Sequence, residues 1–140
     1  MPEKLTITWQ ELHKDTKALC RKIKKAGDFN KIVAVSRGGL VPAGILAYEL
    51  NIRNSSVVNL ISYDDDRKLD TAKVFGLDGE IDDKTIIVDD LSDTGSSIAI
   101  LRNLYPQALY AVVYAKPEGL KAPDIYAKKM KDVWIVFPWD

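Results

Sequence analysis

The chain has 140 residues, and its 20 basic side chains balance its 20 acidic ones, so the formal net charge is zero. This balance gives no electrostatic reason to expect binding to nucleic acid or to an anionic membrane, although anionic small molecules remain possible ligands. One cysteine, Cys20, excludes an internal disulfide framework, and no apolar run resembles a signal peptide or a membrane span, so we expect one cytoplasmic domain over residues 1–140.

The first predicted element is a helix over residues 8–25. The sequence T-W-Q-E at residues 8–11 is a capping box, in which the threonine caps the helix and the glutamate reaches back, and Gly27 is the expected stop. The only histidine, His13, lies on this helix and is expected at the surface. With one histidine and one cysteine, a structural zinc site is excluded. The positions expected to be buried are Leu12, Leu19 and Ile23.

The next segment predicts a buried strand, a glycine turn and a helix. Residues 32–35 form an apolar run rich in valine and isoleucine, S-R-G-G follows at residues 36–39, and a helical pattern covers residues 41–50. Two glycines allow backbone N–H groups to approach a ligand closely, and Arg37 supplies a forked, permanently charged donor. Taken alone, the segment is equally well explained as an ordinary strand–helix turn.

Residues 84–97, KTIIVDDLSDTGSS, repeat this order with acids added. A β-branched strand over residues 86–88 is followed by Asp89 and Asp90, and then by a loop rich in glycine and hydroxyl groups that opens a helix. A helix N-terminus preceded by such residues offers unpaired N–H groups to a phosphate. Acids beside that phosphate site suit a ligand that also carries hydroxyl groups or a metal ion, and a ribose phosphate bound with Mg2+ has both.

Between these two segments, a strand predicted over residues 57–61 leads into residues 62–80, which lose apolar periodicity. A stretch of this length without regular structure is either functional or disordered in a compact domain. Its many charged side chains favour a solvated hairpin, and a functional loop remains the alternative.

The last third of the chain predicts a strand over residues 109–114 and an aromatic strand within residues 133–140. Lys116 follows the first of these strands, where open α/β sheets place ligand-binding residues, although a charge can also simply mark a strand end. The terminal aromatic side chains could pack into the core or form a plate that stacks on a flat heterocycle.

Alternating strands and helices predict an α/β fold with a doubly wound, mostly parallel sheet flanked by helices. In such a sheet the two glycine turns, at residues 36–39 and 91–97, should lie together at the carboxyl edge.

The segment over residues 84–97 resembles the phosphoribosyl pyrophosphate (PRPP) signature of the type I phosphoribosyltransferase family. With S-R-G-G-L-V-P at residues 36–42, A-K-P at residues 115–117 and P-W-D at residues 138–140, the whole chain is similar to the purine branch of that family, the bacterial xanthine-guanine phosphoribosyltransferases. The resemblance implies a type I phosphoribosyltransferase-like fold with a small C-terminal hood over residues 116–140. It also implies a mobile loop over residues 62–80.

The activity that the resemblance implies is purine salvage: the ribose 5-phosphate of PRPP is transferred to N9 of guanine, xanthine or hypoxanthine, giving GMP, XMP or IMP and pyrophosphate. Mg2+ is the implied cofactor, and a homodimer or homotetramer is the implied assembly. The resemblance implies that Asp89 and Asp90 bind the ribose hydroxyls and Mg2+. The 5′-phosphate is implied to bind to Thr94, Gly95, Ser96 and Ser97. Pyrophosphate is implied to bind to Arg37 and Gly38, with a strained or cis peptide near Arg37–Gly38.

The same resemblance implies the residues of the base site. Asp93 faces N7 of the purine and is the expected catalytic residue, Lys116 donates to the 6-oxo group, and Trp134 stacks on the ring. The backbone of Ile135 contacts the 2-substituent side, and Arg67 contributes from the mobile loop. Two alternatives stay open: a non-catalytic PRPP sensor or RNA-binding regulator on the same fold, and a phosphoribosyltransferase for a different base.

Overall fold

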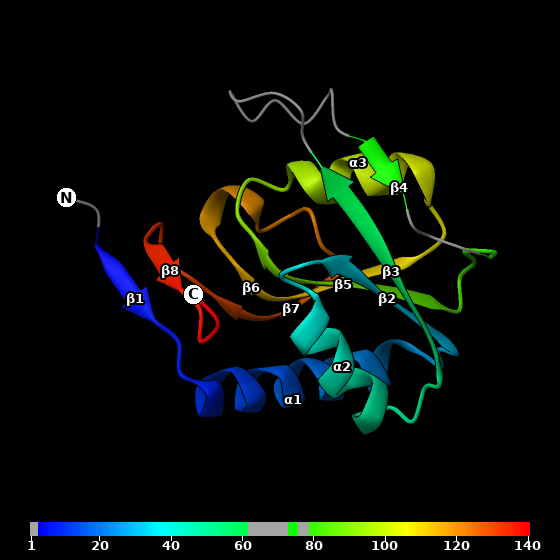
Figure 1. Cartoon of the computed structure of the whole chain (residues 1–140), viewed down its shortest axis with the longest axis horizontal. Helices are drawn as coiled ribbons and strands as arrows, with labels where there is room; N and C mark the ends of the chain where they lie inside the picture. The colour runs from blue at the N-terminus through cyan, green and yellow to red at the C-terminus, as the bar shows by residue number, and fades with distance from the viewer. Residues whose placement is uncertain (1–2, 62–72, 76–78) are drawn as a thin grey trace.

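The computed structural model describes residues 3–61, 73–75 and 79–140 (Figure 1). Three α-helices, one 3-10 turn and eight strands alternate along these residues. In chain order they are β1 (Lys4–Thr6), α1 (Trp9–Ala26), β2 (Lys31–Ser36), α2 (Leu40–Glu49), β3 (Asn54–Ile61), β4 (Lys73–Phe75), β5 (Thr85–Ser92), α3 (Ser96–Leu104), β6 (Leu109–Ala115), the 3-10 turn η2 (Pro117–Gly119), β7 (Ile125–Lys129) and β8 (Trp134–Val136).

The main sheet has the strand order β4-β3-β2-β5-β6-β7. All neighbours pair in parallel except β4, which runs antiparallel to β3 at the edge, so the predicted mostly parallel α/β sheet is confirmed. The chain order reverses between β2 and β5, which makes the carboxyl ends of these two strands the switch point where ligands bind in open sheets.

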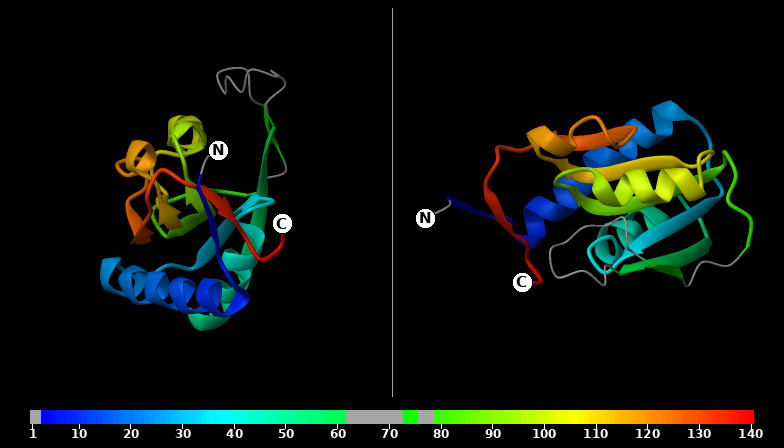
Figure 2. Two further views of the ribbon diagram at one scale, coloured as in Figure 1. Left: turned by 90° about the vertical axis from the view of Figure 1, so that its left-hand side faces the viewer. Right: turned by 90° about the horizontal axis from the view of Figure 1, so that it is seen from above.

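Helices cover both faces of this sheet. Figures 1 and 2 show α1 and α2 on one face and α3 on the other. The residues of β2 alternate between two hydrophobic clusters: Ile32 and Ala34 pack with α1 and α2, whereas Val33 and Val35 pack with α3. Burial on both faces explains why this strand is a continuous apolar run in the sequence.

The predicted helix boundaries agree with those of the structure to within about two residues. The capping box of α1 is formed, with Thr8 Oγ1 accepting from the Glu11 amide at 3.1 Å and Glu11 Oε1 accepting from the Thr8 amide at 3.2 Å. Leu12, Leu19 and Ile23 are buried, as predicted. None of the helices described is long and apolar enough to cross a membrane.

Several strands differ from the sequence prediction. Strand β5 continues to Ser92 because β6 pairs with Asp89, Leu91 and Ser92, so Asp89 and Asp90 lie within the strand and not after it. Strands β1 and β7 were not predicted, since β1 is wholly exposed and β7 is only half-buried. Strand β4, within the segment 62–80, pairs antiparallel with β3, which is consistent with the hairpin that the charged residues of this segment favour.

The predicted C-terminal strand is present as β8, which lies outside the main sheet. It pairs in parallel with β1, so that the two ends of the described chain form a separate two-stranded sheet (Figure 1). The Ile7 amide extends this pairing by donating to the Val136 carbonyl at 2.8 Å.

Candidate functional site

The two glycine turns meet where the switch point predicts. A Cβ built on Gly38 would lie 2.5–2.6 Å from the carboxyl atoms of Asp90, and a Cβ on Gly39 would overlap the carbonyl oxygen of Val88. Only glycine lets the turn after β2 lie directly on the end of β5. The peptide between Ser36 and Arg37 is cis, one bond before the position expected from the resemblance.

Asp89 and Asp90 form the acidic centre of this site. The Asp90 amide donates to Asp89 Oδ1 at 2.8 Å, which fixes the first carboxyl group against the backbone of the second residue. Burial, followed by the charge of Asp90, raises the pKa of the Asp89 carboxyl well above its usual range. Burial also raises the pKa of Asp90, and the charge of Asp140 adds to this effect.

Two adjacent carboxyl groups whose charges are unfavourable together can accept a divalent cation. No group of three potential metal ligands is formed by histidine, cysteine or acidic side chains in the part of the chain that is described. A cation held here by Asp89 and Asp90 would therefore need further oxygen ligands from a bound molecule. Mg2+ is usually bound in this way, through one or two carboxylates together with substrate phosphates and water.

The loop after β5 turns at Gly95 and leads directly into α3. Gly95 adopts a left-handed conformation (φ 89°) as the N-cap of α3, so it offers no side chain to cap the helix. Thr94 and Ser96 hydroxyls lie 2.8 Å apart, and the Ser96 amide donates to Thr94 Oγ1 at 3.2 Å. Ser97 stands in the first turn of α3, where backbone N–H groups and the helix dipole favour an anion.

A buried lysine stands beside this loop. Lys116 Nζ lies 3.6 Å from Asp93 Oδ1, and the lysine side chain is 8% exposed whereas that of Asp93 is 60% exposed. A charge buried to this degree requires a partner. Since Asp93 is open to solvent, the pair presents an N–H donor and a carboxylate acceptor side by side to an incoming molecule.

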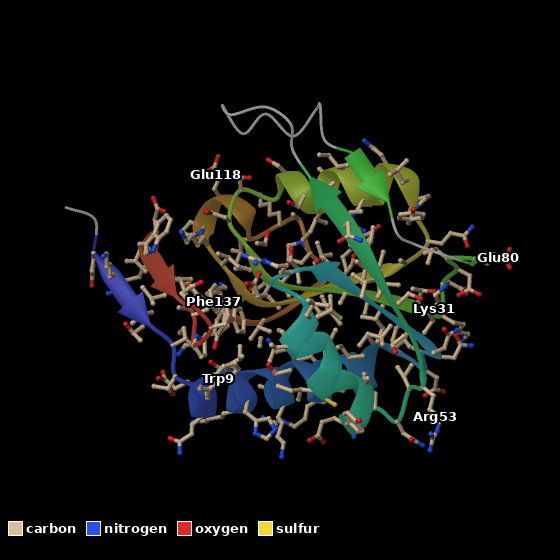
Figure 3. All side chains as sticks on the ribbon, viewed as in Figure 1. Trp9, Lys31, Arg53, Glu80, Glu118 and Phe137 are labelled. Atoms are coloured by element: carbon tan, nitrogen blue, oxygen red, sulfur yellow. The ribbon has the colours of Figure 1, made fainter. Side chains whose placement is uncertain are left out.

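The two-stranded sheet of β1 and β8 divides the terminal aromatic residues into two groups. Phe137 and Trp139 stack at 4.9 Å between centroids, and Trp139 also meets Trp9 edge-on at 6.1 Å. Figure 3 locates Trp9 and Phe137 below β8. Trp134 instead remains 57% exposed, although its backbone is held by the Glu3 carbonyl at 2.9 Å. Core packing thus applies to Phe137 and Trp139, and stacking of Trp134 on a heterocycle stays a prediction.

The remaining predicted residues are placed as follows. Arg37 is exposed in the turn after β2, and Ile135 is buried on β8 between its two neighbours. Arg67 lies outside the described residues, as does most of the segment 62–80.

Three further residues contact this region although the sequence did not predict a role for them there. The Asp140 carboxyl accepts from the Phe137 amide at 2.8 Å and is close enough to Asp90 to raise its pKa. Ser92 and Gly119 join the loop after β5 to the turn after β6. The P-W-D sequence was a usable signal for Asp140, whereas a serine and a glycine at these positions carry no pattern of their own.

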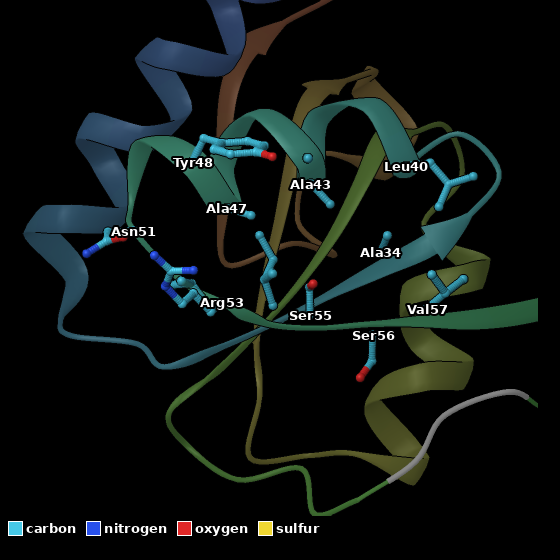
Figure 4. A pocket seen from close by; sticks show the side chains of 13 residues that line it. Ala34, Leu40, Ala43, Ala47, Tyr48, Asn51, Arg53, Ser55, Ser56 and Val57 are labelled. Atoms are coloured by element: carbon cyan, nitrogen blue, oxygen red, sulfur yellow. The ribbon is translucent and has the colours of Figure 1, made fainter.

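A separate pocket of about 500 Å3 lies between α2 and β3, and no predicted site residue lines it. Figure 4 shows Leu40, Tyr48 and Arg53 at its rim, with the small side chains of α2 beneath. The pocket is mainly apolar at the helix and polar near the strand, and it offers none of the acids, glycine turns or buried lysine found at the switch point. It is therefore a second surface feature and not the candidate site.

Comparison with known proteins places this site in a family. The family described as “Phosphoribosyl transferase domain” matches residues 8–140. A xanthine-guanine phosphoribosyltransferase of Chromohalobacter salexigens is 41% identical over 141 residues, covering 99% of this chain and 85% of the relative. One from Idiomarina loihiensis is 43% identical over 140 residues, covering 96% of this chain and 85% of the relative.

Among solved structures, the purine phosphoribosyltransferase of Pyrococcus horikoshii superposes with a TM-score of 0.82 at 29% identity, covering 99% of this chain and 94% of that one. The similarity thus extends over the whole arrangement of sheet, helices and terminal strands, and is not confined to one motif.

Proposed function

The chain belongs to the phosphoribosyltransferase family, and from this premise we propose that it is a purine salvage phosphoribosyltransferase. It transfers the ribose 5-phosphate of PRPP to N9 of guanine, xanthine or hypoxanthine and releases pyrophosphate. The observation that carries the choice of a 6-oxopurine is the buried Lys116 paired with the exposed Asp93 beside the phosphate loop. The names of the two relatives above point in the same direction.

The sugar and its phosphates bind along the ends of β2 and β5. Asp89 and Asp90 accept hydrogen bonds from the ribose hydroxyls, and Thr94, Gly95, Ser96 and Ser97 hold the 5′-phosphate through hydroxyls and backbone amides. Arg37 and the amide of Gly38 bind the pyrophosphate group. The contact of Gly38 with Asp90 supports this assignment, because it places pyrophosphate and ribose groups side by side.

Mg2+ suits the two carboxyl groups of Asp89 and Asp90, since adjacent carboxylate oxygens are ligands that this cation prefers and burial disfavours their negative charge when no cation is bound. When bound there together with PRPP, it would supply positive charge that favours departure of pyrophosphate. The protein side chains contribute by holding the ribose hydroxyls in the same place.

The base binds across Asp93 and Lys116. Lys116 donates to the 6-oxo oxygen, Asp93 holds or accepts the proton at N7, Trp134 stacks on the ring, and the backbone of Ile135 meets the 2-position. A charged donor disfavours adenine, whose 6-amino group cannot accept its hydrogen bond. Among these residues, the exposure of Trp134 supports a stacking role, because more than half of its surface is open within the described part of the chain.

Catalysis then rests on position and charge. As the bond from C1 to pyrophosphate breaks, positive charge develops on the ribose, and N9 of the purine attacks from the opposite face. Arg37 stabilises the leaving group while Asp93 adjusts the protonation of the base. No covalent intermediate with the protein is required. Arg67, for which a contact with PRPP is proposed, lies outside the described residues.

The test is a steady-state assay with PRPP, Mg2+ and one base at a time, in which nucleotide and pyrophosphate are measured together. Equal amounts of the two products with guanine, xanthine or hypoxanthine support the proposal. Turnover with a pyrimidine alone would assign another base, and binding of PRPP without turnover of any base would favour the regulator alternative.

We further propose that the protein acts in the cytoplasm, as one domain over residues 1–140, and that it assembles as a homodimer or homotetramer through α2. This helix is apolar along its length until Glu49, yet Leu40 is 43% exposed and Tyr48 is 91% exposed at the pocket of Figure 4. A helix that is apolar on all sides is normally covered. A second copy of the chain is the partner that suits this face.

A further inference from the structure

Ser92 connects the two halves of the site. It is the last residue of β5, is only 3% exposed, and precedes Asp93 directly. Its hydroxyl donates to the Gly119 carbonyl at 2.7 Å, and its own carbonyl accepts from the Lys116 amide at 3.0 Å. One residue of the phosphate-side strand therefore holds both ends of the turn that begins at Lys116.

The turn that contains Gly119 packs tightly against Ser92. A Cβ built on Gly119 would overlap the Ser92 carbonyl oxygen and lie 2.6 Å from its hydroxyl. Gly119 in turn donates its amide to the Lys116 carbonyl at 3.0 Å, which closes the 3-10 turn. The turn is located in Figure 3 by Glu118, whose side chain points outward to solvent. The inner side of the turn thus rests on Ser92.

The far end of the same segment is attached to α3. Arg102 donates to the Ala122 carbonyl at 2.7 Å and pairs with Asp124 at 3.4 Å. A Cβ built on Gly95, the N-cap of α3, would lie 2.7 Å from that of Ala122. The segment that follows the Lys116 turn is therefore attached to α3, and the buried side-chain hydrogen bond from Ser92 to Gly119 is the side-chain attachment nearest to Lys116.

We infer that Ser92 is a positioning residue that sets the separation between Asp93 and Lys116, and thereby the affinity and 6-oxo selectivity of the base site; this inference rests on the proposed function. The hydroxyl acts through the turn and touches neither substrate. Without it, the buried Gly119 carbonyl lacks a donor, and the turn must shift toward water to satisfy it. Lys116 shifts with the turn, whereas the ribose acids on β5 do not.

The experiment compares Ser92→Ala with Thr16→Val. Thr16 is a matched control because its hydroxyl is also fully buried and donates to a backbone carbonyl at 2.7 Å, that of Leu12, but within α1. Both variants lose one buried side-chain hydrogen bond, but the Leu12 carbonyl also accepts the helical backbone amide, so Thr16→Val leaves no carbonyl without a donor. For Ser92→Ala we expect the KM for guanine to rise roughly three- to tenfold, with kcat and the KM for PRPP changed less than about twofold.

Selectivity is the readout that a purely structural role would not change. In Ser92→Ala the preference for guanine over adenine, as a ratio of kcat/KM, should fall by a similar factor, whereas Thr16→Val should keep the wild-type ratio. Ser92→Cys keeps the side-chain size with a weaker donor and should give an intermediate value; it carries the test if the alanine variant does not fold. Gly119→Ala, which must displace the turn, should shift the KM for guanine in the same direction.

Two results overturn the inference. One is an unchanged guanine-to-adenine ratio in both Ser92 variants, and the other is an equal kinetic change in Thr16→Val. A wild-type protein that turns over no purine would contradict the proposed function instead, so the two failures are distinguishable.

Discussion

At the residue scale, the candidate site buries two acidic side chains next to each other. Asp89 and Asp90 sit on adjacent positions of one strand, and burial raises the pKa of both. A group whose pKa is higher in the folded protein than in the unfolded chain favours folding below the unfolded value, and this contribution is lost as pH rises through the folded value. These acids therefore lower the stability of the ligand-free protein at neutral pH.

Asp90→Asn should consequently stabilise the ligand-free protein while abolishing its activity. Because burial raises the pKa of Asp90, we expect the free energy of unfolding to increase at pH 8, where the carboxyl group would be charged, and to increase less at pH 5. Denaturant unfolding at both pH values measures this. Asp132→Asn, at an exposed position, is the control and should change neither value. A destabilised Asp90→Asn protein at pH 8 would contradict the account.

Asp93 is proposed to contact the purine base and not the ribose, and a substitution at Asp93 tests this role. In Asp93→Asn, kcat should fall by roughly 10²-fold, the range of general acid–base catalysis, while the dissociation constant of PRPP changes little. Presteady-state turnover and equilibrium binding of PRPP give the two quantities separately. Equal losses in both would remove Asp93 from the base site.

Lys116 is assigned to the 6-oxo group, and Lys116→Met tests it while filling the space of the buried stem. Removal of the charged donor should lower kcat/KM for guanine by roughly tenfold or more and leave adenine turnover unchanged or improved. The ratio of kcat/KM for the two bases is the measurement. Unchanged guanine kinetics would mean that the lysine only marks the end of β6.

At the element scale, the pairing of β1 with β8 joins the two ends of the described chain. Trp134 on β8 is exposed, while Trp139 after it stacks on Phe137, so the two tryptophans lie in different surroundings. In this arrangement the exposed ring of Trp134 is free to stack on a flat base, while the Phe137–Trp139 stack stabilises the segment that follows β8.

Trp134→Ala and Trp139→Ala should therefore separate function from stability. The first should raise the KM for guanine roughly three- to tenfold, with the free energy of unfolding unchanged within about 0.5 kcal/mol. The second should lower the free energy of unfolding by about 2 kcal/mol or more, because it empties a packed aromatic cluster. Base kinetics and denaturant unfolding of both variants form the comparison, and a reversed pattern would contradict it.

At the scale of the whole molecule, the parallel sheet could be predicted because its strands are buried on both faces and thus apolar throughout, as at Ile32–Val35 and Ile86–Val88. The grouping of Asp90 with Gly38 followed from the rule that the carboxyl ends of parallel strands share an edge. Strand β1 could not be predicted, because three exposed residues paired with a distant partner leave no periodic signal. The role of Ser92 depends on contacts with the turn after β6, which only the fold brings near.

The claim on which the whole account depends is that this site joins PRPP to a 6-oxopurine. The most direct measurement is a competition assay, in which the protein receives PRPP, Mg2+ and equal amounts of guanine and adenine, and the nucleotides formed are separated by chromatography. The account predicts GMP and an equal amount of pyrophosphate, with at most a trace of AMP. Formation of no nucleotide, or of AMP in amounts equal to GMP, would contradict it.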